Sequence, residues 1–297
     1  MTSSSILISG VGRIGEALTK IIAPTRQREI ALWDTDSNKI NHSFSVTQLA
    51  ASADVIFLCM PASAVREFIT SITPQLKPTA QVVSLIKGLD PASGATMAEL
   101  LQDILPPAVK PVMLGGPILS GELLAGRAAY GLAGCQPQVF PAIAELFAPT
   151  LLRVSHSDDI LGVSAAGVLK NIYALGLGIA SALNVGDNAL GKLTVQAIQE
   201  MQALVTQLGG KVETVSSLAG LGDLVATGFS PHSRNRSVGQ ALVHGTAIST
   251  PSEGMLALPL LFKRLGNISS HPFFSAVALV VQQRATAAVA YQELLRA

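Results

Sequence analysis

Two patterns of apolar residues divide this chain. Over residues 5–150, short β-branched runs alternate with segments whose apolar residues recur every three to four positions, which is typical of βαβ units. The predicted strands are Ile6–Ser9, Ile30–Trp33, Val55–Cys59, Gln81–Ser84, Val112–Leu114 and Ala129–Leu132. The predicted helices between them are Ile14–Ile22, Ala64–Ile72, Thr96–Ile104 and Gln138–Leu146. This half is predicted to be an α/β domain built on a doubly wound parallel sheet.

The strand pattern ends at about residue 152. Beyond it, apolar residues recur only at helical spacing. The predicted helices are Asp158–Leu183, Asn188–Leu208, Val215–Leu218, Ser237–Val243, Pro259–Leu265 and Phe273–Leu295. We therefore predict two domains, an α/β domain over residues 1–152 and an all-α domain over residues 153–297.

Composition narrows the class of protein. Hydrophobic residues make up 49% of the 297 residues and charged residues 13%, which excludes intrinsic disorder. The 20 basic and 19 acidic residues leave a net charge of +1, so no basic face for a nucleic acid is expected. A charge-poor surface is most simply covered by a second copy of the chain, so we expect a homodimer through the helical domain.

The cysteines, the first residues and the histidines indicate the cellular compartment and whether a metal is bound. Cys59 and Cys135 lie in apolar stretches, which is typical of reduced thiols in a cytoplasmic protein. The first residues lack the basic region of a signal peptide, and the charge-free stretches are too interrupted to span a membrane. The five histidines show no metal-ligand spacing, so no metal site is predicted.

A glycine-rich turn follows the first predicted strand. Gly10, Gly12 and Gly15 form the pattern G-x-G-x-x-G between a strand and a helix. The first glycine permits the tight turn, the second lets a pyrophosphate approach the backbone, and the third allows close packing of helix and strand. The second strand ends at Asp34, where a carboxylate can bind a ribose hydroxyl. The pattern predicts a Rossmann-like, dinucleotide-binding domain.

Asp34 also bears on the choice of cofactor. A carboxylate at this position repels the 2′-phosphate of NADP, so Asp34 favours NAD. The alternative interpretation is that Asp34, together with Asp36, is only a turn residue.

Further motifs occur in a fixed order along the chain. They are Ile86-Lys-Gly-Leu89, Gly115-Gly-Pro117 followed by Glu122, Val168-Leu-Lys-Asn-Ile-Tyr-Ala174, Gly186-Asp-Asn188, Ala219-Gly-Leu-Gly-Asp-Leu-Val225 and Ser233-Arg-Asn-Arg236. In these motifs the chain resembles the NAD(P)-dependent glycerol-3-phosphate dehydrogenase family from residue 6 to about 255. The resemblance implies reversible reduction of a small phosphorylated triose, dihydroxyacetone phosphate, to glycerol 3-phosphate for phospholipid synthesis. It also implies a helical domain of the 6-phosphogluconate dehydrogenase C-terminal-like class.

The resemblance assigns roles to individual residues. It makes Lys170 the proton donor and acceptor, with Lys87 and Asp223 as its catalytic neighbours. The substrate-binding positions that it implies are Lys87, Gly116, Lys170, Asn171, Asp223, Ser233, Arg234 and Asn235. The cofactor-contacting positions are Gly10, Gly12, Arg13, Ile14, Gly15, Lys87, Ser120, Arg234 and Glu253, to which the glycine-turn pattern adds Asp34.

The residue types suit these roles. Reduction of a ketone needs a proton donor at the oxygen, and a lysine whose pKa is lowered by burial or by a nearby cation can serve near neutral pH. A guanidinium and the amides of a helix start bind phosphate, and Ser233 is predicted to cap the helix that begins at Arg234. The alternatives are a core lysine that reaches out to solvent for Lys170, a turn or N-cap aspartate for Asp223, and solvated arginines on an ordinary helix.

Three differences separate the chain from the family pattern. Ile118 stands where the family has a small hydroxyl residue, the segment after Asp34 is short, and the chain ends early after the helices. Two other functions therefore stay open. One is a related dehydrogenase for another small hydroxy acid or phosphate, and the other is a non-catalytic dinucleotide-binding protein.

Overall fold

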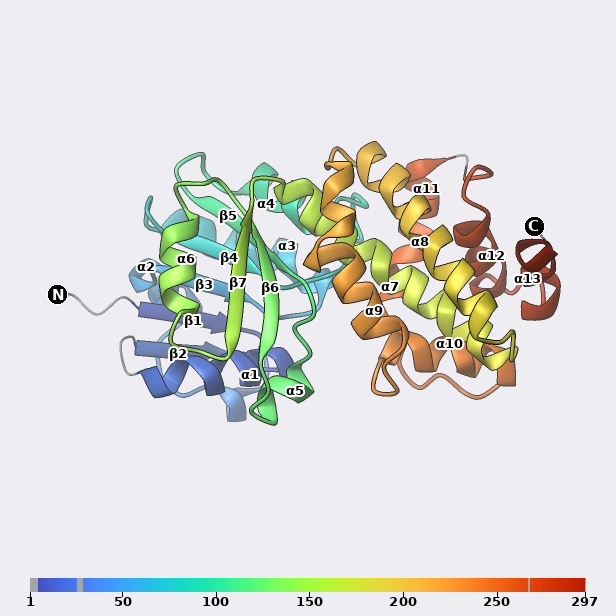
Figure 1. The fold of residues 1–297 in the computed structure, drawn as a ribbon. Helices are drawn as coiled ribbons and strands as arrows, with labels where there is room; N and C mark the ends of the chain where they lie inside the picture. Colours follow the sequence, from blue (N-terminus) through green and yellow to red (C-terminus); the bar gives the residue numbers. More distant parts are fainter. Residues whose placement is uncertain (1–4, 26–28, 267, 297) are drawn as a thin grey trace.

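The structure, a computed structural model, describes residues 5–25, 29–266 and 268–296. A sheet flanked by helices occupies one end of the molecule, and a bundle of helices occupies the other (Figure 1). The two-part organisation expected from the hydrophobic pattern is present.

Seven strands form one sheet in the order β2-β1-β3-β4-β5-β6-β7. They are β1 (Ser5–Ser9), β2 (Glu29–Trp33), β3 (Val55–Leu58), β4 (Gln81–Ser84), β5 (Lys110–Gly115), β6 (Ala129–Gly134) and β7 (Leu152–Ser157). Strands β1 to β5 are parallel, β6 is antiparallel to β5, and β7 is parallel to β6. The α/β prediction is confirmed, but the sheet is mostly rather than wholly parallel. An antiparallel neighbour needs only a return connection, which the short segment around α5 (Ser120–Leu124) provides.

Helices cover both faces of the sheet. On one face Ile8 and Phe57 pack with α1 (Arg13–Ile22), α5 and α6 (Phe140–Phe147). On the other face Leu7 and Ile56 pack with α2 (Val46–Ser52), α3 (Ala62–Ile72) and α4 (Met97–Ile104). Because both faces of the sheet are buried, the central strands are apolar throughout. These continuous apolar runs are what allowed the strands to be predicted from the sequence. Helices α2 and α5 were missed because they are too short to show helical periodicity.

Strand β7 corrects the prediction that the strand pattern ends at about residue 152. It pairs with β6 from Leu152 to Ser157. As the outer strand of the sheet it is only partly buried, and its sequence LRVSHS therefore lacks an apolar run. The sheet continues to Ser157 and the next helix begins at Ile160, so we propose a domain boundary between these residues.

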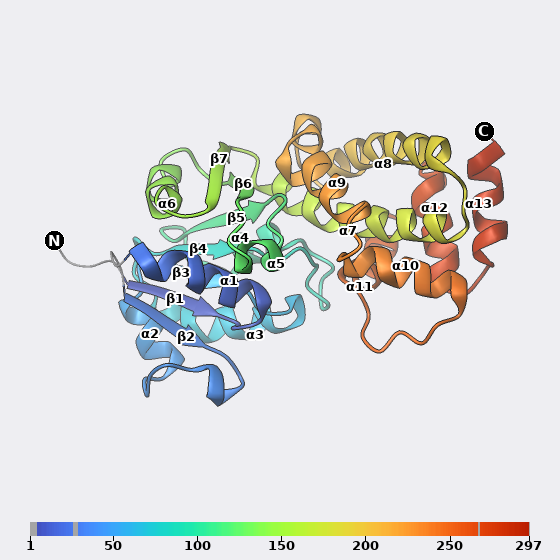
Figure 2. The ribbon, with the colours of Figure 1, turned by 60° about the horizontal axis from the view of Figure 1, so that its bottom comes forward.

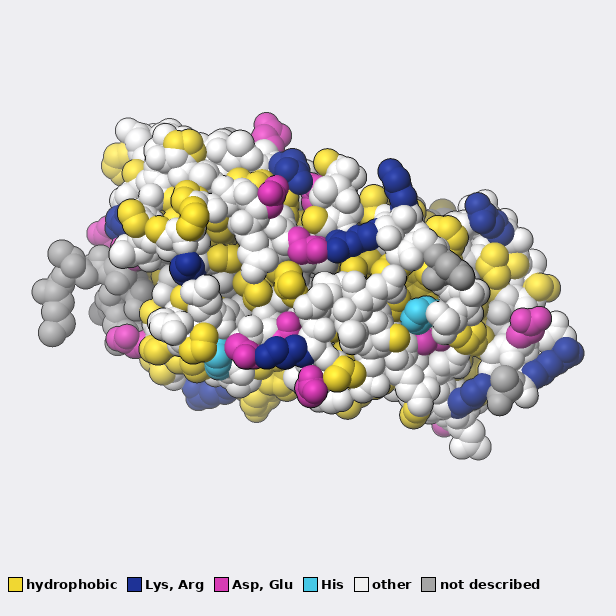
Figure 3. All heavy atoms as spheres, turned by 90° about the horizontal axis from the view of Figure 1, so that it is seen from above, with side chains coloured by type: hydrophobic (Ala, Val, Ile, Leu, Met, Phe, Trp, Pro, Cys, Tyr) yellow, Lys and Arg dark blue, Asp and Glu magenta, His cyan; other side chains and the backbone are white. Residues whose placement is uncertain are grey.

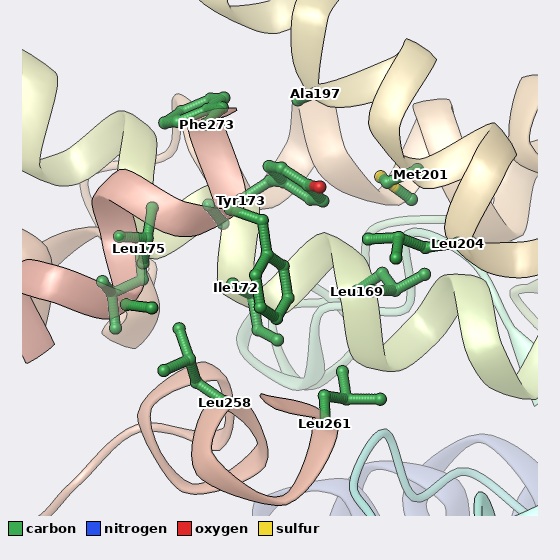
Figure 4. Close-up of a cluster of buried hydrophobic side chains, with 14 of the residues drawn as sticks. Leu169, Ile172, Tyr173, Leu175, Ala197, Met201, Leu204, Leu258, Leu261 and Phe273 are labelled. Atoms are coloured by element: carbon green, nitrogen blue, oxygen red, sulfur yellow. The ribbon is translucent and has the colours of Figure 1, made fainter. Parts of the chain in front are cut away.

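The helical part is built around one central helix, α7 (Ile160–Ala182). Around it lie α8 (Asp187–Gln207), α9 (Asp223–Gly228), α10 (Arg234–His244), α11 (Glu253–Leu265), α12 (Pro272–Val281) and α13 (Ala287–Arg296). Figure 2 shows α7 and α8 side by side, with α12 and α13 across their far ends. In Figure 4, Leu169 and Tyr173 of α7 lie among side chains of α8, α11 and α12, including Met201 and Leu261.

Three predicted helices differ from the structure. Pro259–Leu265 is the second half of α11, which begins at Glu253 and contains Pro259 in its interior. Phe273–Leu295 is divided into α12 and α13 by a turn in which Gln283 has a φ of +56°. In place of a helix at Val215–Leu218, a 3₁₀ turn (Val212–Ser216) precedes a π turn (Leu218–Gly222). Apolar spacing alone does not distinguish these tighter and wider turns from an α-helix.

Helix α7 is the one helix among the described residues that is long and apolar enough to cross a membrane. Its most apolar window is 89% buried within the fold. Its apolar character is therefore explained by its place at the centre of the bundle. On the face drawn in Figure 3, charged side chains lie singly or in small clusters of mixed sign, without a large patch of one sign.

Candidate active site

An aspartate lies between two lysines where the sheet meets the helices. Lys87 Nζ, on the segment after β4, donates to Asp223 Oδ2 at 2.5 Å, and Lys170 Nζ of α7 lies 3.0 Å from Asp223 Oδ1. Only 5% of Lys170 and 1% of Asp223 is exposed. Three residues that were predicted as catalytic from separate motifs therefore form one buried cluster.

The environment changes the acidity of this cluster. Burial lowers the pKa of Lys170 to about 8, with the charge of Lys87 acting in the same direction and that of Asp223 opposing it. Burial works to raise the pKa of Asp223, but the charges of Lys170 and Lys87 outweigh it and lower that pKa. The aspartate thus stays ionised, while the lysine can gain or lose a proton near neutral pH.

Thr227 completes the surroundings of the Lys170 ammonium. Lys170 Nζ donates to Thr227 Oγ1 at 2.8 Å, and Thr227 Oγ1 donates to Asp223 Oδ1 at 3.2 Å. Sequence reasoning missed Thr227. Its position four residues after Asp223 on α9 was the available signal, because residues at that spacing share one face of a helix.

Glycines let α10 and α11 approach α7 closely enough to reach this cluster. A Cβ added to Gly178 of α7 would lie 2.3 Å from Arg236 O, and one added to Gly239 of α10 would lie 2.2 Å from Leu175 O. At the start of α11, a Cβ on Gly254 would lie 2.4 Å from Asn171 O. Backbone contact at these points places the first residues of both helices beside Asn171, the neighbour of Lys170 in α7.

Side-chain amides connect the same elements. Asn171 Nδ2 donates to Lys87 O at 3.2 Å, Asn235 Nδ2 donates to Asn171 Oδ1 at 2.9 Å, and Gly254 N donates to Asn235 Oδ1 at 3.0 Å. This chain of bonds joins the segment after β4 to α7, α10 and α11. In this structure both asparagines hold the site together through these contacts.

The start of α10 has the predicted cap. Ser233 Oγ accepts from Arg236 N at 3.3 Å, so Ser233 is the N-cap. The exposed Arg234 guanidinium donates to Thr250 O at 2.7 Å, in the loop before α11. Gly116, a further predicted substrate residue, accepts a 2.9 Å hydrogen bond from Lys87 Nζ at its carbonyl, and its φ is +114°.

Glu253 joins the cluster from the first turn of α11. Its Oε2 would lie 3.2 Å from a Cβ added to Gly88, the residue after Lys87. Burial raises the pKa of Glu253, and the charges of Lys170 and Arg234 oppose this shift. The structure thus brings a residue predicted to contact the cofactor close to Gly88, which follows Lys87.

The glycine turn has the geometry that its sequence predicted. Gly10 has a φ of +90°, and a Cβ there would lie 2.6 Å from Met60 N. A Cβ on Gly15 would lie 2.2 Å from Gly10 O, whereas nothing lies within 4 Å of a Cβ on Gly12. Gly12 begins α1 without a side-chain cap, so the amides of the first turn are left for an anion.

A cavity of about 570 Å³ adjoins this turn. It has an apolar lining that includes Trp33 and Phe68, whose ring centroids are 4.8 Å apart. At its edge, Asp34 Oδ2 accepts from Val11 N at 2.7 Å. An apolar slot for a base, a carboxylate for a ribose and open helix amides for a pyrophosphate fit a dinucleotide.

Arg13 and Ser120 lie elsewhere around α1. They line a second cavity of about 500 Å³ together with Arg127, Ser230 and His232. Ile14, half-buried, follows Arg13 on α1. The predicted cofactor residues are therefore distributed over both sides of the glycine turn.

Ile118, which stands where the family has a small hydroxyl residue, lies in the core of the α/β domain. It is 7% exposed and belongs to the core that contains Leu114 and Leu123, and its Cδ1 would lie 3.3 Å from a Cβ on Gly131. Its side chain fills the core beneath β6.

The chain is similar to known proteins along most of its length. The family models for the N-terminus and C-terminus of NAD-dependent glycerol-3-phosphate dehydrogenase match residues 37–140 and 159–292. A glycerol-3-phosphate dehydrogenase [NAD(P)+] from Rhodopseudomonas palustris (strain BisA53) is 30% identical, with 99% of this chain and 98% of that protein covered. The chain belongs to the NAD-dependent glycerol-3-phosphate dehydrogenase family. It is therefore an oxidoreductase whose cofactor is NAD or NADP.

A second relative and a crystal structure show the degree of similarity in sequence and in fold. Glycerol-3-phosphate dehydrogenase [NAD(P)+] 2 from Sphingopyxis alaskensis is 39% identical over 71% of this chain and 63% of that protein. The crystal structure of glycerol-3-phosphate dehydrogenase from Coxiella burnetii superimposes with a TM-score of 0.88 at 28% identity, covering 99% of both chains. The differences noted in the sequence therefore leave the family fold unchanged.

Proposed function

We propose that this protein reversibly reduces dihydroxyacetone phosphate to sn-glycerol 3-phosphate. The observation that carries the proposal is the buried Lys87–Asp223–Lys170 cluster beside a dinucleotide-binding turn. A phosphorylated ketone needs a proton donor at its carbonyl oxygen and positive charge for its phosphate, and this cluster and its neighbours offer both.

Lys170 is the proposed proton donor. With a pKa of about 8 it is largely protonated at neutral pH, yet it releases its proton more readily than an exposed lysine does. Asp223 and Thr227 hold its ammonium in place. When bound, the nicotinamide cofactor supplies the hydride, and Lys170 supplies the proton to the ketone oxygen. In the oxidative direction neutral Lys170 accepts the hydroxyl proton.

Substrate binding is assigned to the residues around this donor. Arg234 and the first amides of α10, capped by Ser233, provide donors for a phosphate, while Asn235 and Asn171 keep α10 against α7. Lys87 and the backbone at Gly116 border the same cluster.

Cofactor binding is assigned to the glycine turn and its surroundings. Gly10, Gly12, Arg13, Ile14 and Gly15 would hold the pyrophosphate side. Asp34 would hold the adenosine ribose, which supports a preference for NADH over NADPH. Lys87, Ser120, Arg234 and Glu253 complete the residues assigned to the cofactor.

The biological setting is proposed on the same basis. Glycerol 3-phosphate made by this reaction would feed phospholipid synthesis in the cytoplasm. Exposed apolar residues on the helical part, including Val195 and Val289, support a homodimer through that part.

The decisive experiment is an absorbance assay at 340 nm with purified protein, dihydroxyacetone phosphate, and NADH or NADPH. We expect oxidation of the reduced nucleotide that depends on the triose phosphate. Failure with this substrate but turnover with a hydroxy- or keto-acid would favour the related dehydrogenase. Nucleotide binding without turnover on any of these substrates would favour a non-catalytic protein.

A further inference from the structure

The cavity beside the glycine turn has an asymmetric charge distribution at its edge. Asp34 and Glu67 bring carboxylates to the cavity lining, and Lys39 is the only basic side chain among the described residues that line it. Lys39 belongs to none of the motifs that resemble the family. Its place in this lining is a result of the tertiary structure.

A series of hydrogen bonds positions Lys39 relative to Asp34. Asp34 Oδ1 accepts from Asp36 N at 3.0 Å. Asp36 in turn caps the 3₁₀ helix Ser37–Lys39, because its Oδ1 accepts from Asn38 N at 3.1 Å and from Asn38 Nδ2 at 3.0 Å. The short segment after β2 is thus folded back so that its last residue faces the same cavity as its first.

The carboxylate of Asp34 is already engaged by the protein. Its two oxygens accept from Val11 N and Asp36 N. Burial would raise the pKa of Asp34, but these hydrogen bonds and the positive charge of Lys39 lower it, so the carboxylate is ionised at neutral pH. Within the described residues, no group accepts a hydrogen bond from the Lys39 ammonium, which therefore keeps all three of its donors for a ligand.

We propose that Lys39 binds the 2′-phosphate of NADP(H), and that it thereby gives this chain the capacity to use NADPH in spite of Asp34. This inference rests on the proposed cofactor placement, in which Asp34 holds the adenosine ribose. A phosphate on the ribose 2′-oxygen would then enter the edge of the cavity at Asp34. There it would meet repulsion from the Asp34 and Glu67 carboxylates, and the ammonium of Lys39 is the compensating charge that the cavity lining offers. NAD, which lacks this phosphate, has no need of Lys39.

The simpler interpretation is that Lys39 only neutralises Asp34. The two interpretations differ in one measurable respect, since a purely neutralising lysine would affect ligands with and without the 2′-phosphate alike. The mononucleotides 2′,5′-ADP and 5′-AMP differ by that phosphate alone, so they isolate its contribution.

The fluorescence of Trp33 can report nucleotide binding directly. Trp33 is the single tryptophan of the chain and lines the cavity itself. Titration of its fluorescence with 2′,5′-ADP and with 5′-AMP, repeated by calorimetry, measures both dissociation constants without any turnover. A failure here is therefore distinct from a failure of the proposed dehydrogenase activity.

The variants are K39A and K39Q, with K263A as the matched control, because Lys263 is an exposed lysine of α11 outside this cavity. We expect loss of the ammonium to weaken binding of 2′,5′-ADP about tenfold, and to change binding of 5′-AMP by less than about twofold. The affinity for 2′,5′-ADP relative to 5′-AMP should also decline with added salt in the wild-type chain and not in K39A. In steady-state assays, the NADPH to NADH ratio of kcat/KM should fall by a similar factor.

Two results would overturn the proposal. One is equal weakening of both mononucleotides in K39A, which would make Lys39 a general neutralising charge. The other is unchanged binding of 2′,5′-ADP in both Lys39 variants, which would place the 2′-phosphate elsewhere.

Discussion

Lys170 Nζ and Asp223 Oδ1 lie 3.0 Å apart in a region where both side chains are almost wholly buried. Such a pair costs desolvation energy, and it persists because Thr227 and Lys87 supply further hydrogen bonds. The arrangement keeps the ammonium of Lys170, whose pKa is lowered, next to the carboxylate of Asp223, which stays ionised. This relationship, and the helix contacts that create it, have consequences for activity and stability that can be measured.

Replacement of Lys170 by Met should abolish proton transfer while Asp223 remains paired with Lys87. We expect kcat to fall by about 10²–10⁴-fold, the usual contribution of a general acid. Nucleotide binding, measured by Trp33 fluorescence, should change by less than about twofold. Activity within tenfold of the wild type would show that another group donates the proton.

The pH dependence should differ between the two directions of the reaction. Reduction requires protonated Lys170, so its rate should be level below pH 8 and decline above it, given the pKa of about 8. Oxidation requires neutral Lys170, so its rate should rise through the same range. Profiles of kcat/KM measured in both directions test this, and an identical pH dependence of the two would contradict the assignment.

Thr227→Val should act through Lys170. Removal of the hydroxyl leaves the buried ammonium with one acceptor fewer, at a cost of about 1–3 kcal/mol. Because the charged form loses this partner, the pKa of Lys170 should fall further and the pH profile of reduction should shift to lower pH. Thr227→Ser should restore the wild-type profile. A reduced rate with an unshifted profile would instead indicate a purely structural role.

The close contact of α10 with α7 should depend on glycine. Gly178→Ala and Gly239→Ala place a Cβ against backbone atoms, so each should destabilise the protein by about 1–3 kcal/mol and lower activity by displacing Arg234 and Asn235. Gly191→Ala in α8 is the matched control, because nothing lies within 4 Å of its added Cβ. There we expect unchanged or increased stability. Thermal unfolding compares the three variants, and an equal effect in all of them would exclude close packing as the cause.

Local patterns allowed part of the site to be predicted. The glycine turn depends on residues adjacent in sequence, and Gly10 and Gly15 adopt the tight geometry that their spacing requires. The motifs around Lys170 and Asp223 indicated, through their resemblance to a family, side chains that the structure brings into contact. Their direct contact was not predictable from spacing, since it depends on α7 and α9 meeting in the bundle.

The sequence by itself determined the two-part architecture, because strands buried on both faces and amphipathic helices leave strong periodic patterns. It also determined the dinucleotide turn, whose conformation depends on the absence of Cβ atoms at a few neighbouring positions. Only the tertiary structure decided the direction of β6, the extent of the sheet through β7, and the burial of Ile118 in the core. The same holds for Thr227 beside Lys170 and for Lys39 at the edge of the nucleotide cavity. These features arise from contacts between segments far apart in the chain, and such contacts leave no period or spacing in the sequence.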